Sequence, residues 1–230
     1  MNTTGSISFE NMFSGCISIT SIPQLDTSSG TNFNAMFSGC SSLTSIPQLD
    51  TSKGTNFGAM FNGCKALTSV PQLDTSSGTN FSGMFSNCSS ITTIQQIDTS
   101  SGTNFNGIFS NCLNLKRIEG ISLKSLNKTV GYFYLTGYRD MNYLRYALIK
   151  DIGTCTDMTS ISFTYWPVWG VEDETSPDAR QSLIDSLLTY SFDRATAGYS
   201  TCTITLLSYT KALLTEDEIA QITSKGYTIA

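Results

Sequence analysis

The sequence predicts a solenoid of the α/β class, in which a short repeated unit coils and stacks on its neighbours. A Met-Phe-x-Gly-Cys motif returns every 24 residues, with Ile and Asn variants, starting at Met12, Met36, Met60, Met84 and Ile108. Between the copies runs Ser-Ile-Pro-Gln-Leu-Asp-Thr-Ser, at 21–28, 45–52 and, with one Val for Ile, 69–76. A fixed period of this length is typical of solenoids. A single coil cannot bury its own apolar face, so neighbouring coils must stack.

The segment between two motifs predicts a short strand and a loop. Residues 43–49 are too few for a helix and include Pro47, which indicates an extended segment. The following loop, 50–56, is rich in turn-forming residues. Asp50 is expected to accept a hydrogen bond from the backbone two residues on, and Gly54 to adopt a positive φ.

The motif itself predicts a short helix over residues 57–62. Phe57, Met60 and Phe61 have the i, i+3, i+4 spacing that places them on one helical face. Gly63 is expected to end this helix. Each coil is therefore predicted to consist of strand, loop and short helix, giving a parallel strand ladder on one side and helices on the convex side.

The repeated pattern resembles the BspA-like leucine-rich repeats. The resemblance rests on Met-Phe-x-Gly-Cys-x-x-Leu-Thr-Ser-Ile-Pro followed by Leu-Asp-Thr-Ser-x-x-Thr-Asn-Phe, and it covers residues 7–118. It implies a leucine-rich-repeat solenoid, a right-handed β-α superhelix. It also implies a bacterial surface or secreted protein from mouth or gut, engaged in adhesion to a host.

Three regions follow from the loss of the strict period. Residues 1–118 carry the regular repeats, 119–175 are expected to form degenerate repeats, and 176–230 a C-terminal α/β cap. Strands are expected at 132–135, 144–150, 159–164, 201–207 and 227–230, and helices at 179–190 and after the capping box at 215–218. A solenoid needs such an end to hide its last apolar face.

Charge and hydropathy exclude several functions. The net charge is -5, with 13 basic and 18 acidic residues, so the clustered Lys and Arg of a nucleic-acid-binding surface are missing. No stretch approaches the ~20 apolar residues of a membrane span, and no membrane insertion is expected. The first residues do not form a signal peptide. Because the chain begins partway through a coil, we expect it to be a piece of a longer protein located at the bacterial surface or outside the cell.

Metal, cofactor and catalytic chemistry are not expected. The chain has no His and no Cys-x-x-Cys pair, so a zinc site and a His-activated nucleophile are both disfavoured. Five cysteines recur once per repeat, and the evenly spaced set indicates free, buried thiols (Cys16, Cys40, Cys64, Cys88 and Cys112). The repeated Asp26, Asp50, Asp74 and Asp98 could form a calcium ladder, but one carboxylate per loop is too few, and a repeated turn residue is the simpler interpretation.

Two sets of residues are candidates for binding. Gln24, Gln48, Gln72 and Gln96 flank the predicted strands and are expected to face solvent on the strand side, which is the usual binding face of solenoids. The irregular middle is rich in aromatic residues, of which Tyr146, Tyr165, Trp166 and Trp169 are the candidates, because Tyr and Trp suit interfaces and sugar stacking. The simpler alternatives are a solvated polar sheet and the core of a less regular coil.

These observations favour a non-enzymatic binding module that adheres to a host protein or a glycan. The alternative is a structural spacer or stalk, on a cell surface or a phage tail, that presents another domain. A hydrolase with its site in the irregular half is the third hypothesis. End-to-end pairing of two copies through the N-terminal coil is also expected, because solenoid ends are open.

Overall fold

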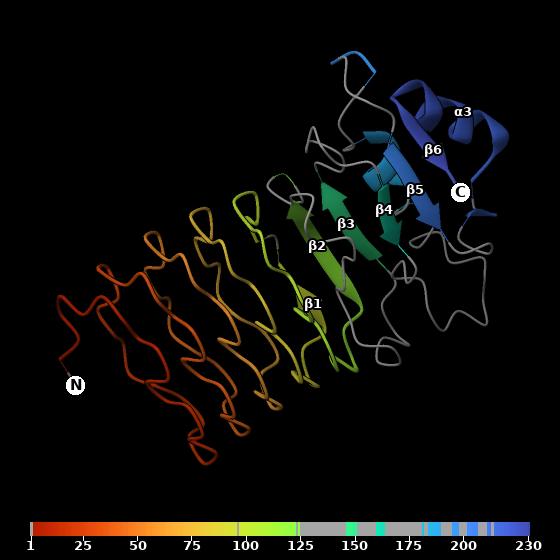
Figure 1. Cartoon of the computed structure of the whole chain (residues 1–230). Helices are drawn as coiled ribbons and strands as arrows, with labels where there is room; N and C mark the ends of the chain where they lie inside the picture. Colours follow the sequence, from red (N-terminus) through yellow and green to blue (C-terminus); the bar gives the residue numbers. More distant parts are fainter. Residues whose placement is uncertain are drawn as a thin grey trace.

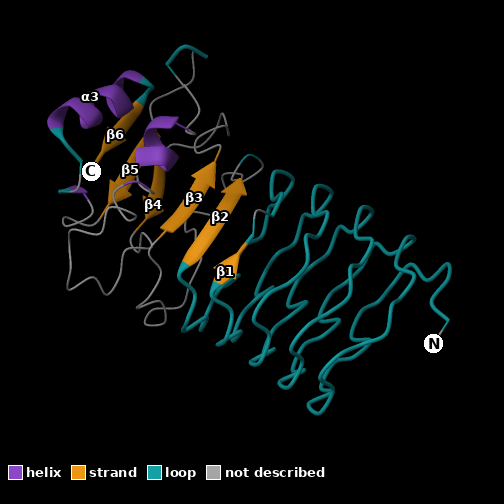
Figure 2. Cartoon of the chain, turned by 180° about the vertical axis from the view of Figure 1, so that it is seen from behind, coloured by secondary structure: helices purple, strands orange, loops and turns teal. Residues whose placement is uncertain are grey.

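The chain forms an elongated stack of coils that runs from the N-terminal repeats to a C-terminal α/β region (Figure 1). The computed structural model describes residues 2–95, 97–122, 124, 146–150, 160–163, 181, 184–189, 195–197, 202–206, 211–212 and 214–230. Seen from behind, the first four repeats consist almost wholly of loops and turns (Figure 2). The 24-residue period is therefore a structural period, and the predicted solenoid of stacked repeats is confirmed.

Each repeat contains a double turn whose amide groups bond alternately within the coil and to the next coil. These turns occupy residues 9–16, 33–40, 57–64, 81–88 and 105–112. In the third repeat, Phe57 N–H donates to the Asn80 carbonyl at 2.9 Å, and Met60 N–H donates to the Phe57 carbonyl at 3.2 Å. The same alternation continues through Ala59 and Phe61. Four such bonds of 2.6–3.0 Å join each pair of adjacent turns from the first repeat to the fifth.

This pattern shows that the predicted short helix at 57–62 is wrong. Ala59 has a φ of 52° and Gly63 one of 74°, and a left-handed residue in mid-segment is incompatible with a right-handed α-helix. The local bonds join residues three apart, whereas every second amide donates to the neighbouring coil. Gly63, expected to end the helix, is instead a left-handed residue within the double turn. Phe57, Met60 and Phe61 are all buried, as their spacing indicates.

The left-handed positions recur at the same places in every repeat. The first is occupied by Asn11, Ala35, Ala59, Gly83 and Gly107, and the second by Gly15, Gly39, Gly63, Asn87 and Asn111. Gly and Asn tolerate this conformation well, whereas Ala does not. The two alanines are therefore held in place by the surrounding bonds.

The predicted parallel strand ladder is largely absent from the first three repeats. Residues 43–49 contain no strand, although Thr44 N–H donates to the Thr20 carbonyl at 3.0 Å. Pro47 has no amide hydrogen and cannot donate to a ladder. The first strand, β1 (Thr93–Ile94), appears in the fourth repeat, where Gln95 stands in place of the proline.

Two three-stranded parallel sheets follow along the stack (Figure 1). The first has the order β1-β2-β3 and includes β2 (Arg117–Ser122) and β3 (Tyr146–Lys150). The second has the order β4-β5-β6 and contains β4 (Ser160–Phe163), β5 (Cys202–Leu206) and β6 (Tyr227–Ile229). Strands β3 to β6 lie where the sequence predicts them, whereas the strand expected at 132–135 lies outside the described residues.

The C-terminal helix confirms its predicted start. Helix α3 (Glu216–Ser224) is preceded by the N-cap Thr215, and Glu218 completes a capping box. The helix predicted at 179–190 is described only in part, as the π-helical turn η1 (Asp185–Thr189) and two further helical residues. Within the described part of the chain, no helix is long and apolar enough to cross a membrane.

Two columns of stacked phenylalanine rings form the centre of the repeat core. Ring centroids in neighbouring coils are 5.4–5.8 Å apart and the planes are within 19° of parallel, in the columns Phe9–Phe33–Phe57–Phe81–Phe105 and Phe13–Phe37–Phe61–Phe85–Phe109. The predicted positive φ of Gly54 is wrong. This position instead needs Gly for space, because a Cβ there would lie 2.4 Å from the Phe57 ring.

The repeated thiols are free, and four of the five are buried. Each buried Sγ donates to the backbone carbonyl of a Phe in the preceding coil, as from Cys64 to Phe37 at 3.1 Å. Burial raises the pKa of Cys64 to about 12. It also raises the pKa of Cys88. The predicted role as small core groups is confirmed for these four.

Exchanging Ala and Gly at the first left-handed position should change stability in opposite directions. We expect Ala59→Gly to raise, and Gly83→Ala to lower, the free energy of unfolding by about 1 kcal/mol. A Cβ at Gly83 would meet only ordinary van der Waals contacts, so the conformation alone is tested. Urea denaturation measures the effect. Ala66→Gly, outside the left-handed positions, is the matched control and should destabilise. A stability gain from Gly83→Ala would contradict this account.

Alkylation of the native protein should separate the thiols by burial. We expect Cys16, which is partly exposed, to react with iodoacetamide at pH 8 before the four buried cysteines of the repeats do. Cys64 and Cys88 should stay protected because burial disfavours their reactive thiolate forms. Peptide mass spectrometry gives the site-by-site rates, and the unfolded protein serves as the control. Equal native rates at all three sites would contradict the stacked core.

Candidate binding groove

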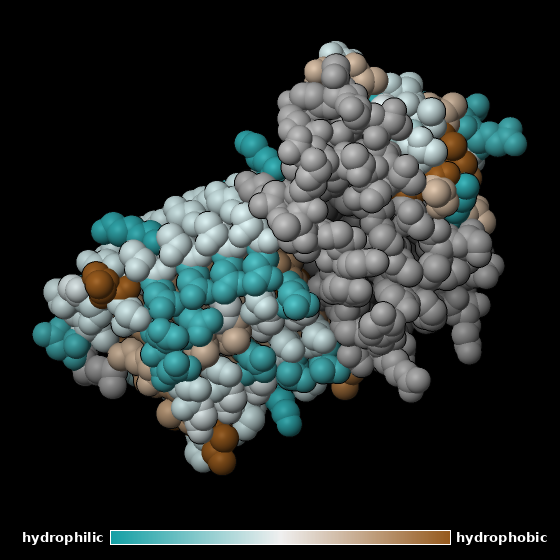
Figure 3. All heavy atoms as spheres, viewed as in Figure 1, coloured by the Kyte–Doolittle hydropathy of each residue, from teal (hydrophilic) through white to brown (hydrophobic). Residues whose placement is uncertain are grey.

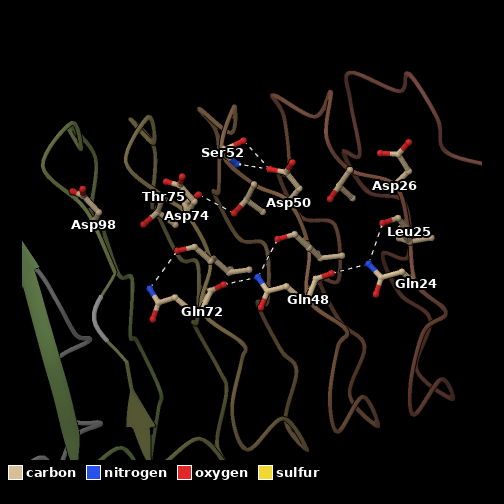
Figure 4. Close-up of a pocket in the computed structure, with 14 residues that line it drawn as sticks. Gln24, Leu25, Asp26, Gln48, Asp50, Ser52, Gln72, Asp74, Thr75 and Asp98 are labelled. Atoms are coloured by element: carbon tan, nitrogen blue, oxygen red, sulfur yellow. Dashed lines mark hydrogen bonds between the residues drawn. The ribbon is translucent and has the colours of Figure 1, made fainter.

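A groove runs across the repeats where the sequence Gln-Leu-Asp-Thr recurs. Along this extended stretch the side chains alternate, so that Gln and Asp are exposed while Leu and Thr are buried, as at Gln48, Leu49, Asp50 and Thr51. Period-two alternation of this kind is the property of an extended backbone. Figure 4 shows the Asp side chains in one row and the Gln side chains in a second row beside it.

The Gln row is held by bonds from each side-chain amide to backbone carbonyls. The Nε2 of Gln48 donates to the Leu49 carbonyl at 3.2 Å and to the Gln72 carbonyl of the next coil at 2.6 Å. Gln24 makes the equivalent bonds to Leu25 and Gln48. Both amide hydrogens of these two side chains are therefore used, and the carboxamide oxygen is left as the group for a ligand.

The Asp row is ordered by the serine two residues further on. The carboxylate of Asp50 accepts from the Ser52 backbone N–H at 3.1 Å and from its hydroxyl at 2.7 Å. The predicted Asx-turn is confirmed. The Ser52 hydroxyl, and secondly its N–H, lowers the pKa of Asp50. Asp26 and Asp74 have the same arrangement and lowered pKa values, so these three carboxylates are ionised at neutral pH.

A column of buried threonines lines the same groove. The hydroxyl of Thr51 donates to the backbone carbonyl of Asp74 in the next coil at 2.8 Å. The hydroxyl oxygens of Thr27 and Thr75 are buried and have no hydrogen-bond partner. Buried hydroxyl groups without partners are uncommon in proteins.

The groove between the two rows has a volume of about 930 Å³ and spans the Gln-Leu-Asp-Thr stretches of three repeats as far as Asp98. Hydrophilic side chains also gather in bands that run across the coils on the face seen in Figure 3, which is the view of Figure 1 and not that of the close-up in Figure 4. The part of the chain that the structure describes holds no group of three or more His, Cys, Asp or Glu residues able to bind one metal ion. The arrangement can hold a ligand by hydrogen bonds and charge.

The structure brings together three of the predicted binding residues. Gln24, Gln48 and Gln72 line the groove side by side. Gln96, Tyr165, Trp166 and Trp169 lie outside the described residues, and so does the side chain of Tyr146, whose backbone belongs to β3.

From the sequence, the four aspartates are interpretable only as turn residues or calcium ligands. The position of the Asp row beside the Gln row was not predicted. The available signal was the spacing: Gln and Asp stand two residues apart in four successive repeats, which places both on one face of an extended segment.

Residues 7–136, more than half of the 230-residue chain, match the family described as "Mycoplasma protein of unknown function, DUF285". The chain belongs to this family. The description of DUF285 assigns no activity to its members. The repeats that build the groove all lie inside the matched part.

Other comparisons add little to the DUF285 assignment. No curated protein sequence matches the chain. Among solved structures, it is similar to the crystal structure of the T. pallidum leucine rich repeat protein (TpLRR), with a TM-score of 0.44 and 17% sequence identity over 73% of this chain and 71% of the other. This level of similarity supports no transfer of structural detail or function.

Removing the serine hydroxyl should raise the pKa of the adjacent aspartate. We expect Ser52→Ala to move the pKa of Asp50 towards its ordinary value near 3.9, as measured by carbon NMR of the carboxyl during a pH titration. Ser45→Ala, another exposed serine, should leave it unchanged.

The same variant should change acid stability in a defined direction. A lowered pKa stabilises the fold above the ordinary aspartate value, and this contribution is lost as pH falls through the lower folded pKa. The difference in unfolding free energy between wild type and Ser52→Ala should therefore shrink below about pH 4. A difference that grows on acidification would contradict the assignment.

Proposed function

We propose that this chain is a non-enzymatic binding module of the leucine-rich-repeat type, related to the BspA-like repeats. In this proposal it belongs to a bacterial surface or secreted protein and adheres to a host extracellular protein or a glycan. The observation that carries the proposal is the groove of about 930 Å³ between the repeated Gln and Asp side chains.

The construction of the groove supports binding rather than chemistry. Its side chains are held by the bonds of Gln48 to the neighbouring backbone and by the Asx-turn of Asp50. Side chains ordered before a ligand arrives lose little entropy on binding, which favours affinity. The sequence contains no His, and the groove offers carboxylates and amides without an evident nucleophile and base pair.

The repeated spacing supports a partner with repeated features. Equivalent groups recur at every coil, so that an extended ligand can make the same contact several times. Each exposed hydrogen bond contributes little by itself, and several linked contacts together give useful affinity. Extended surfaces of stacked repeats are used for binding in solenoid proteins generally.

A spacer is the second candidate, supported by the continuity of the core. The phenylalanine columns and the four inter-coil bonds per interface run unbroken through the five repeats. Such a rod can hold another domain at a fixed distance without binding anything itself.

A binding screen separates the two candidates. We expect the intact chain to bind members of a glycan array or an extracellular-protein panel. Gln48→Ala with Gln72→Ala should weaken that binding about tenfold if the groove is used, and Trp166→Ala with Trp169→Ala should do so if the aromatic segment is used. Gln221→Ala, on exposed α3, is the control, and thermal melting checks that every variant is folded.

The outcome that would contradict adhesion is equally clear. A folded intact chain that binds nothing on either panel at high micromolar concentration favours the spacer. Binding that survives both double substitutions would place the site on another surface.

A further inference from the structure

The acidic groups of the central repeats all stand in the groove. Between residues 24 and 98 the sequence has four carboxylates, and they are the four members of the Asp row. The same stretch has two basic residues, Lys53 and Lys65. The one ion pair within the described residues joins Arg117 and Glu119, away from this row. Among the described residues no member of the row is in an ion pair, and the nearby charge of Lys53 contributes only to lowering the pKa of Asp50.

The carboxylates are close enough to repel each other. The Ser52 hydrogen bonds, and more weakly the charge of Lys53, lower the pKa of Asp50, whereas the charge of Asp26 opposes this shift. The charge of Asp50 likewise opposes the lowering of the pKa of Asp74 by its bonds to Ser76. The coil spacing, measured between stacked phenylalanine rings, is 5.4–5.8 Å. A ligand with positive charges at this interval would relieve the repulsion at each coil.

The other groups of the groove also favour a donor-rich ligand. The carboxamide oxygens of Gln24 and Gln48 are acceptors, because both amide hydrogens are already used. Thr27 and Thr75 line the groove with buried hydroxyl oxygens that lack a partner. Acceptors and carboxylates together select ammonium groups, which carry only donors.

We propose that this groove binds a linear polyamine, with one ammonium group at each coil. Bonds of about 1.5 Å place two nitrogens joined by three methylene groups about 5 Å apart, and those joined by four about 6 Å apart. These intervals bracket the coil spacing of 5.4–5.8 Å. The ligand lies along the stack between the Asp and Gln rows, and its methylene segments cross the backbone between them.

Two other cationic ligands fit the groove less well. A calcium ion needs six to eight oxygens around one centre, whereas each coil supplies one carboxylate and the described residues hold no metal-binding cluster. An extended peptide with Lys at alternate positions repeats every ~7 Å. That interval exceeds the coil spacing, so successive lysines lose register with the carboxylates.

Calorimetric titration with spermine at low ionic strength tests the proposal. We expect saturable binding that weakens as salt is added, because salt screens the charges. The double variant Asp50→Asn with Asp74→Asn should bind at least about tenfold more weakly, since half of the row is neutral. Asn retains the Asx-turn, so the fold should be kept, and thermal melting verifies this.

A matched control distinguishes spermine binding in the groove from a general effect of the chain's negative charge. Glu216→Gln with Asp217→Asn removes the same number of charges from the exposed start of α3, and spermine affinity should stay within about twofold of wild type. Backbone amide NMR shifts on titration should concentrate at Ser28, Ser52 and Ser76, whose N–H groups contact the Asp row.

Three results would overturn the proposal. The first is that spermine shows no saturable binding. The second is that the groove variant and the control variant weaken spermine binding equally. The third is that magnesium, or a diamine at the same concentration of positive charge, binds as tightly as spermine. The proposal goes beyond the adhesive function and does not depend on it. A blank glycan and protein panel together with spermine binding would remove the adhesive function alone, whereas the reverse result would remove the polyamine site alone.

Discussion

The fold depends on an alternation of backbone hydrogen bonds in the double turns. One amide closes a turn within its coil and the next donates to the following coil, as at Met60 and Phe61. This alternation requires a left-handed residue twice per repeat. Met60 and Phe61 lie between the left-handed Ala59 and Gly63, and both are fully buried. The repeat therefore needs neither a helix nor a long strand to be regular.

The burial pattern of the repeat could be predicted from its sequence, but the backbone conformation could not. Phe57, Met60, Phe61 and Cys64 are all fully buried, as their recurrence indicated. The spacing i, i+3, i+4 describes both a helical turn and two consecutive turns of three-residue bonds, so it could not decide between them. The residues at the first left-handed position are Asn, Ala or Gly. This preference indicates a left-handed backbone only when the repeats are aligned and the position is compared across all five.

The exposed Gln row of the groove could be predicted from the sequence, but its position beside the Asp row could not. Exposure of Gln24, Gln48 and Gln72 follows from their places flanking an extended segment. The proximity of the Asp row follows from the same alternation, but a turn-forming Asp already had a sufficient local explanation in its bond to Ser52. Short-range sequence patterns thus account for the local role of each residue. The groove itself forms only because neighbouring coils stack in register, which aligns equivalent residues into rows.

The inter-coil bonds also give the stack a net dipole along its axis. In each double turn, four peptide units present their N–H groups to the following coil and their carbonyls to the preceding one. Aligned peptide dipoles add, as they do along a helix. Across the five repeats, the columns are therefore partially negative on the side of the first coil, the side towards which the carbonyls of Ser8, Glu10, Met12 and Ser14 point. Two copies meeting by their first coils would bring like ends together, whereas stacking in one direction would continue the columns.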